Sequence, residues 1–295
     1  MLGQVNIFGK TKLEVTLERI KTFEPEEGYY LAFSGGKDSQ CIYHLCKMAG
    51  VKFDAHYRVT SVDPPELVNF IKHKYPDVSR EVPHDDEGNP ITMWSLIASK
   101  TKPPTRKFRY CCEKLKESGG KGRVTMTGVR WAESRSRRSN QGLVTIEQKP
   151  KTTHKKLNEM GVEHKVTDSG GVILNLDNDG ERRAVEMCYR TQKTLVNPII
   201  DWTDDDVWEF LNEIAKVPHC SLYDEGFKRI GCIGCPLAGG KTMRMEFDRW
   251  PIYRKAYIRA FGKMIRNQKE EITTANGKKA EGGVDIFNAW IEWCK

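Results

Sequence analysis

The chain has 295 residues, of which 38% are hydrophobic and 30% are charged, and its formal net charge at pH 7 is +8. This length allows a substantial buried core, and no apolar stretch approaches the ~20 residues of a membrane span, so we expect a soluble globular protein and not an integral membrane protein. The N-terminus lacks the apolar region of a signal peptide, and nine cysteines without an export signal indicate thiols, metal ligands or redox chemistry instead of a disulfide scaffold. We therefore expect a cytoplasmic location.

The first elements in the chain predict a phosphate-binding loop. Residues 1–27 form a helical lead-in that stops at Pro25, and the apolar run from Tyr29 to Phe33 is typical of a buried strand. This strand breaks at Ser34-Gly35-Gly36-Lys37-Asp38-Ser39, and a helical pattern follows. Two adjacent glycines permit positive φ, so successive N–H groups can surround an anion, while the helix N-terminus and Lys37 add positive charge. This loop is not a Walker loop, because the spacing of its glycines differs.

The next elements alternate between strands and helices. The pattern predicts a strand over Phe53–Val59, a helix from Pro65 to about Tyr75, a short strand over Val78–Val82, a helix over Met93–Lys100 and a strand over Arg123–Val129. Such alternation indicates a parallel α/β sheet, whose ligands bind at the carboxyl ends of the strands. We therefore expect the glycine loop and Gly128-Val129-Arg130 to face each other across one site.

The second half of the chain is less regular. The sequence pattern predicts an insertion over residues 139–195, with a β-ribbon over Gly161–Arg183. Thr203 is a predicted N-cap for a helix over Asp204–Ala215, and the chain after Met243 is predicted to be helical with a break near Asn276–Gly283. The expected domains are the lead-in at 1–27, an α/β domain at 28–240 that includes the insertion, and a helical extension at 241–295.

Positive charge is concentrated in one segment. Between Thr101 and Arg138, twelve Lys and Arg residues stand against three Glu residues, a net of +9 that exceeds the excess of the whole chain. A solvated basic face is one explanation. Because the segment also carries a cysteine pair and the end of a predicted strand, a nucleotide or polyanion partner is favoured.

The cysteines indicate a metal centre. Cys232 and Cys235 form a C-x₂-C turn, Cys220 lies twelve positions upstream, and Cys111-Cys112 form a distant pair. Such a set suits an iron–sulfur cluster or a structural zinc, and the C-x₂-C turn alone also suits a redox dithiol. The other four are interpreted as small buried residues or as cysteines without a partner spacing: Cys41, Cys46, Cys188 and Cys294.

Four motifs in order resemble the phosphoadenosine phosphosulfate (PAPS) reductase family. They are Ser34–Ser39, Arg109-Tyr-Cys-Cys-Glu-Lys-Leu-Lys116, Gly128-Val-Arg-Trp-Ala-Glu-Ser-Arg-Ser-Arg137 and Tyr223-Asp-Glu-Gly-Phe-Lys-Arg-Ile-Gly-Cys-Ile-Gly-Cys-Pro236. The resemblance implies an α/β fold of the adenine-nucleotide α-hydrolase-like sandwich type. The first motif is similar to the PP-loop of the ATP pyrophosphatases, which cleave ATP between the α and β phosphates and release pyrophosphate.

The resemblance also implies roles for particular residues. ATP and Mg²⁺ are expected at the loop, through Ser34, Gly35, Gly36, Lys37, Asp38 and Ser39. Lys37 and Asp38 are expected to act in catalysis together with Arg130, Glu133 and Arg137, in which the arginines hold the α-phosphate or the acceptor and Glu133 orients them. A [4Fe–4S] cluster, with zinc as the alternative, is expected on Cys111, Cys220, Cys232 and Cys235. Cys111 is preferred to Cys112 because its spacing to Leu115-Lys116 matches the single-cysteine form of the family motif.

The C-terminal tail departs from the sulfonucleotide reductases of this family. Those enzymes carry a nucleophilic cysteine flanked by glycine and histidine, whereas this chain ends in Phe287-Asn-Ala-Trp-Ile-Glu-Trp-Cys-Lys295. With Cys220 included, the pattern is more similar to the ATP pyrophosphatases of DNA phosphorothioation. We therefore expect an ATP pyrophosphatase that adenylates an acceptor for sulfur insertion.

Two other functions remain open. One is a sulfonucleotide reductase that uses Cys294 or another thiol, and the other is a regulatory nucleotide-binding protein with structural zinc. The expected partners are an adenine nucleotide, nucleic acid with DNA favoured, and a sulfur donor such as a cysteine desulfurase, with no membrane.

Overall fold

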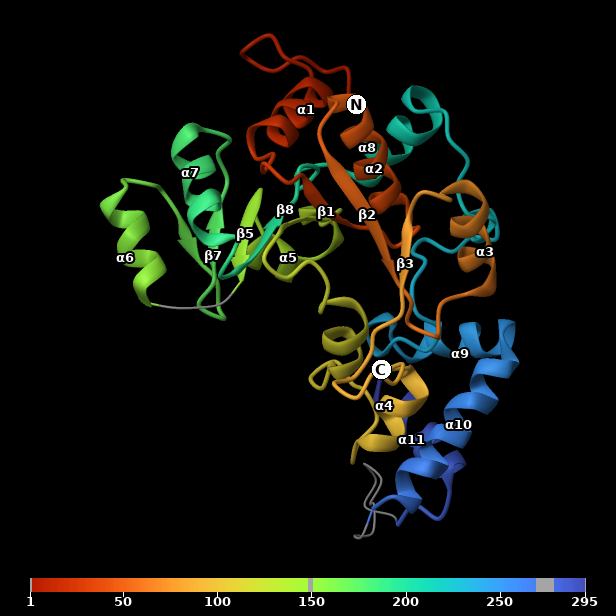
Figure 1. Ribbon diagram of the computed structural model, residues 1–295. Helices are drawn as coiled ribbons and strands as arrows, with labels where there is room; N and C mark the ends of the chain where they lie inside the picture. The colour runs from red at the N-terminus through yellow and green to blue at the C-terminus, as the bar shows by residue number, and fades with distance from the viewer. Residues whose placement is uncertain (1, 148–150, 269–278, 295) are drawn as a thin grey trace. The chain divides into compact units, whose positions relative to one another are not determined.

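The computed structural model describes residues 2–147, 151–268 and 279–294 (Figure 1). Among these residues the strands form one mixed sheet in the order β3-β2-β1-β4-β8-β5-β7-β6. Strands β1, β2, β4 and β8 are parallel neighbours, whereas β5 runs antiparallel to β8 and β7, and β6 runs antiparallel to β7. Their bounds are Tyr29–Ala32 for β1, Phe53–Arg58 for β2, Ser79–Glu81 for β3, Val124–Met126 for β4, Val144–Glu147 for β5, Lys165–Val166 for β6, Val172–Leu174 for β7 and Lys193–Val196 for β8. The predicted α/β fold class is confirmed.

Helices connect and flank these strands. Their bounds are Lys12–Thr22 for α1, Lys37–Ala49 for α2, Pro65–Lys74 for α3, Met93–Ser99 for α4, Arg135–Asn140 for α5, Lys151–Glu159 for α6, Asp179–Cys188 for α7, Asp204–Glu209 for α8, Gly240–Arg249 for α9, Pro251–Arg266 for α10 and Gly283–Trp293 for α11. Helix α2 packs against α1 and α8, and its Ile42, Leu45, Cys41 and Cys46 are fully buried. None of the helices in the described ranges is long and apolar enough to cross a membrane.

The chain divides into two compact units. We call Met1–Tyr57, Phe70–Ser79 and Gly120–Gly226 the loop unit, and Arg58–Asn69, Arg80–Gly119 and Phe227–Lys295 the thiol unit. This division differs from the predicted single domain at 28–240. The reason is packing between segments that are distant in sequence: α4 packs on α10 in the thiol unit, where the ring centroids of Trp94 and Tyr257 lie 5.1 Å apart.

The insertion is only partly the predicted β-ribbon. Strands β6 and β7 do pair around a turn at Gly170, whose φ of +82° favours glycine. The predicted second turn at Asn178 instead begins a helix, because the Asn178 side chain accepts the Glu181 N–H and caps α7. Strands β5 and β7 extend the main sheet, and Figure 1 shows α6 and α7 beside them.

The C-terminal region is helical, as predicted. Phe247, Tyr257, Phe261, Phe287 and Trp290 are buried and lie within ring contact of one another between α9, α10 and α11. Part of the predicted break near Asn276–Gly283 lies outside the described residues. Helix α8 also ends earlier than predicted, at Glu209, and a π-helical turn at Phe210–Ile214 follows it.

Candidate active site

The predicted phosphate loop connects β1 to α2. Gly35 has a φ of +73°, whereas Gly36 is extended, with a φ of −76°, and serves as the N-cap of α2. Gly35 therefore supplies the positive φ that the glycine pair permits. The two serines brace the loop: the Ser34 N–H donates to Ser39 Oγ over 3.2 Å, and the Ser39 hydroxyl donates to the Gly36 carbonyl over 2.9 Å.

A tyrosine hydroxyl lies against the start of α2. The Lys37 N–H donates to the Tyr223 hydroxyl over 2.9 Å, although backbone N–H groups at such a position commonly bind anions. The indole of Trp208 packs edge-on against Tyr223, with ring centroids 5.0 Å apart. The sequence pattern had indicated no role for Tyr223, although it is the first residue of the fourth motif.

Four charged side chains meet beside the loop. The Lys37 ammonium lies 3.2 Å from Asp38 Oδ2 and 3.0 Å from Asp204 Oδ1. Arg130, which is 1% exposed, donates through Nε to Asp38 Oδ1 over 2.7 Å and through Nη2 to Asp204 Oδ1 over 2.8 Å. Two cations and two carboxylates thus form a compact group that we call the charge quartet. Asp204 was missed as a site residue because its position in the first turn of a predicted helix had a purely structural explanation.

The two strand ends approach each other closely, as predicted. A Cβ added to Gly128 would lie 2.9 Å from backbone and side-chain atoms of Asp38, so any larger residue would displace the loop. Gly128 follows β4 and Arg130 follows it by two residues. The absence of a side chain at Gly128 therefore lets Arg130 reach Asp38.

Arg130 is bonded to three protein groups in the structure. Besides its two carboxylate partners, its Nη1 donates to the Trp202 carbonyl over 3.2 Å. The guanidinium thus orients Asp38 and Asp204 directly. A contact between Arg130 and a phosphate, which remains a prediction, has to use its other N–H groups or replace one carboxylate.

Of the other predicted pair, Arg137 lies on α5 and Glu133 lies just before this helix. Glu133 Oε2 and Arg137 Nη1 form an ion pair of 2.6 Å, and both residues are partly buried. Both belong to the loop unit, like the charge quartet. Their expected contact with the nucleotide or the acceptor remains a prediction.

Replacing Arg130 by alanine is expected to lower the free energy of unfolding by about 3 kcal/mol, because it leaves two carboxylates without their shared buried cation. Urea unfolding measures this change. Arg135→Ala, at an exposed arginine on α5, is the matched control and should change stability by less than about 0.5 kcal/mol. Equal stabilities of the two variants would contradict the structural role of Arg130.

In the thiol unit, backbone atoms of the C-x₂-C turn form hydrogen bonds with surrounding residues. The Ile233 N–H donates to the Val62 carbonyl over 2.8 Å, and the Ile233 carbonyl accepts the Tyr257 hydroxyl over 3.0 Å. The Gly234 N–H donates to Glu246 Oε2 over 2.7 Å, and burial raises the pKa of this carboxyl to about 7. Gly234 has a φ of +72°, and a Cβ there would lie 2.5 Å from the Phe247 ring. Three hydrogen bonds and the close approach of Phe247 therefore define the shape of the turn.

A second pair of thiols and a lysine accompany this turn. Interaction between the Cys111 and Cys112 thiols lowers the pKa of Cys112, with help from Arg109, and raises that of Cys111. The charges of Cys232 and Cys235 also raise the pKa of Cys111. Lys116 faces Cys232, and the thiolate charge raises the pKa of the lysine. The thiol unit thus contains Cys111, Cys112, Cys232 and Cys235 near a cation.

The thiols of these cysteines are suitable donor atoms for a metal, but their positions do not form a metal site within the described residues. Among the described residues, no three His, Cys, Asp or Glu side chains are arranged to hold a metal ion. All nine cysteines are free thiols, and thiolates are the donors that iron–sulfur clusters and structural zinc prefer. Cys220 is fully buried and belongs to the loop unit, so the four predicted ligands are divided between the two units.

Cys294, which has no partner spacing in the sequence, has charged and thiol neighbours in the structure. Its thiol interacts electrostatically with Arg106 and Cys235, and its carbonyl accepts the Gly240 N–H over 2.7 Å. The residue is 4% exposed, and burial raises the pKa of its thiol. A protonated and buried thiol is a poor nucleophile in this conformation.

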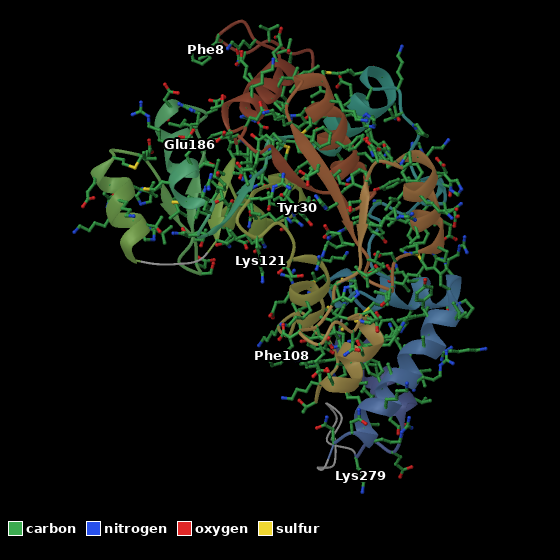
Figure 2. The ribbon with its side chains drawn as sticks, in the orientation of Figure 1. Phe8, Tyr30, Phe108, Lys121, Glu186 and Lys279 are labelled. Carbon is green, nitrogen blue, oxygen red and sulfur yellow. The ribbon has the colours of Figure 1, made fainter. Side chains whose placement is uncertain are left out.

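The basic segment is less continuous than its sequence indicates. Arg123 pairs with Asp54, Arg130 with Asp38 and Asp204, and Arg137 with Glu133. Besides Lys116, which faces Cys232, six cations of the segment form no ion pair with a carboxylate within the described part of the chain: Lys102, Arg106, Lys107, Lys121, Arg135 and Arg138. They divide equally between the two units, and the exposed Lys121 is labelled in Figure 2.

The α/β sheet and its strand–loop–helix site define a protein with the adenine-nucleotide α-hydrolase-like fold. The chain belongs to the phosphoadenosine phosphosulfate reductase domain family, whose model matches residues 28–238. The chain is 27% identical over 246 residues to an uncharacterized protein of Methanocaldococcus jannaschii, which covers 79% of this chain and 46% of that protein.

Similarity to named reductases is shorter. A phosphoadenosine 5'-phosphosulfate reductase of Xanthomonas axonopodis pv. citri is 31% identical over 126 residues, 41% of this chain and 50% of that enzyme. An adenosine 5'-phosphosulfate reductase of Oceanobacillus iheyensis is 36% identical over 61 residues, 21% of this chain and 25% of that enzyme. The chain therefore spans half or less of the length of each of these relatives.

Proposed function

We propose that this chain is an ATP pyrophosphatase that adenylates an acceptor so that sulfur can replace one of its oxygens. The observation that carries the proposal is the loop itself, in which Lys37, Asp38 and two serines surround the N-terminus of α2. The β and γ phosphates would bind at this loop, where Lys37 and the helix N-terminus stabilise charge that moves onto the leaving pyrophosphate.

The proposed reaction has two steps. An acceptor oxygen attacks the α-phosphorus, the bond from that phosphorus to the α–β bridging oxygen breaks, and pyrophosphate leaves with the electron pair. A sulfur nucleophile from a donor then displaces AMP from the acceptor. Mg²⁺ bound with ATP would neutralise phosphate charge, and Asp38 is a carboxylate at the loop that can bind it.

We also propose that the thiol unit holds a [4Fe–4S] cluster, with zinc as the alternative. Cys232 and Cys235 would be ligands because the turn that carries them is fixed by three backbone hydrogen bonds. Cys111 and Cys220 remain our other proposed ligands, and Cys112 is an alternative that lies in the same unit as the turn. A bound cluster would supply a site for sulfur or electron transfer.

A reductase is the second candidate, since named relatives are sulfonucleotide reductases and Cys294 lies near Cys235. The burial of Cys294 and the raised pKa of its thiol favour the pyrophosphatase over this candidate. Reduction that depends on thioredoxin and is lost in Cys294→Ser would support the reductase instead.

The proposed function predicts pyrophosphate release from ATP by anaerobically purified full-length chain, with stimulation by the acceptor. DNA is the acceptor we favour, because unpaired cations of the basic segment can bind phosphates. Stimulation by DNA should fall steeply as salt is raised, because bound counterions are released on association. Stimulation that does not change between low and physiological salt would favour a small acceptor, and no pyrophosphate release under any of these conditions would contradict the proposal.

A further inference from the structure

The charge quartet leaves the loop without net positive charge. Lys37 and Arg130 contribute two positive charges, and Asp38 and Asp204 contribute two negative ones at ion-pair distances of 2.7 to 3.2 Å. The sequence had indicated a cationic loop suited to bare phosphate. The structure instead presents two carboxylates at the position where the phosphates of a nucleotide are proposed to bind.

Asp204 is the more accessible of these carboxylates. Its side chain is 65% exposed, compared with 24% for Asp38. Asp204 Oδ1 lies 3.0 Å from the Lys37 ammonium and 2.8 Å from Arg130 Nη2. Although burial alone would raise the pKa of Asp204, its bonds to Lys37 and Arg130 lower it, so the carboxylate is ionised at neutral pH. This ionised and largely exposed carboxylate is therefore accessible to a cation.

A carboxylate in this place has opposite effects on two forms of ATP. Metal-free ATP carries only negative charge, so Asp204 repels it and also competes with it for Lys37. A divalent cation on the phosphates reverses the interaction, because Mg²⁺ in proteins is commonly bound by one or two carboxylates together with substrate phosphates. Asp38 alone would supply one such carboxylate, and Asp204 would supply a second.

We propose that Asp204 makes the loop selective for nucleotide complexed with a divalent cation over metal-free nucleotide. This inference rests on the proposed binding of ATP at the loop. Asp204 acts as a specificity-determining residue: it is close enough to Lys37 to hold the ammonium when no nucleotide is bound, and it favours the complex that brings its own cation.

Calorimetric titration of ATP, with Mg²⁺ or with EDTA, tests this inference on the full-length chain. The variants are Asp204→Asn and, as the matched control, Asp205→Asn, which removes the same charge from the same helix turn at an exposed residue. The wild type should bind Mg–ATP at least ~10-fold more tightly than metal-free ATP. Asp204→Asn should bind metal-free ATP more tightly than the wild type and should reduce this ratio about tenfold, while Asp205→Asn should keep the wild-type ratio.

Each outcome of this titration decides between the accounts. Tighter binding of metal-free ATP by Asp204→Asn is a gain that a misfolded variant cannot produce. An unchanged ratio in Asp204→Asn, or an equal change in Asp205→Asn, would overturn the inference and leave ATP binding intact. Failure of the wild type to bind either form would overturn the proposed function as well.

Discussion

Replacing Lys37 by alanine is expected to lower pyrophosphate release from ATP by at least ~100-fold, the typical effect of removing one preorganised electrostatic donor. The ammonium lies at the start of α2 within 3.2 Å of Asp38 and 3.0 Å of Asp204, where it can transfer from carboxylate to phosphate. The residue is 7% exposed, so its replacement also removes packing, and the fold of the variant has to be verified by its unfolding transition.

Two further variants test whether the effect is specific to the ammonium group at position 37. Lys37→Arg should also be a poor enzyme, because a planar guanidinium does not fit the place of a compact ammonium between two carboxylates. Lys47 is an exposed lysine on the same helix and pairs with Asp77. Lys47→Ala is therefore the matched control and should keep wild-type turnover. Near-normal turnover of a folded Lys37→Ala protein would refute the assignment of the loop.

Replacing Cys232 by serine is expected to remove bound iron and the broad absorption at about 400 nm from anaerobically purified protein, because a thiolate ligand of the cluster is lost. Cys188→Ser is the matched control at a buried cysteine of the loop unit and should keep both signals. Iron analysis and the absorption spectrum measure the outcome. A colourless, active protein with stoichiometric zinc would refute the cluster, since zinc thiolates do not absorb there.

Variants of three more cysteines identify the remaining ligands. Our prediction is that Cys111→Ser and Cys220→Ser lose iron, whereas Cys112→Ser retains it. Because Cys112 belongs to the thiol unit and Cys220 to the loop unit, retention of iron in Cys220→Ser with loss in Cys112→Ser would move the fourth ligand into the thiol unit. The same iron measurement decides this.

The sequence predicted most of the fold that lies close to the loop. The apolar run of β1, the glycines after it and the helical pattern of α2 are local signals, and the structure has each of them at the expected place. The meeting of Asp38 with Gly128 and Arg130 also followed from a general rule about the ends of parallel strands.

Other features depend on contacts that no local pattern contains. Asp204 reaches Lys37 across more than 160 positions of sequence, and Tyr223 reaches the same residue from even farther along the chain. Likewise, the assignment of residues 80–119 to the thiol unit follows from the packing of α4 on α10. At Asn178 a local signal was misread, because asparagine suits both a tight turn and a helix N-cap.

The central claim is that this loop cleaves ATP between its α and β phosphates, and the identity of the products tests it most directly. ATP labelled at the α-phosphate, incubated with anaerobically purified full-length chain, Mg²⁺ and DNA, should yield labelled AMP, free or attached to the acceptor, together with unlabelled pyrophosphate. Lys37→Ala should yield neither. Labelled ADP with inorganic phosphate, at the same rate in the wild type and in Lys37→Ala, would contradict the account.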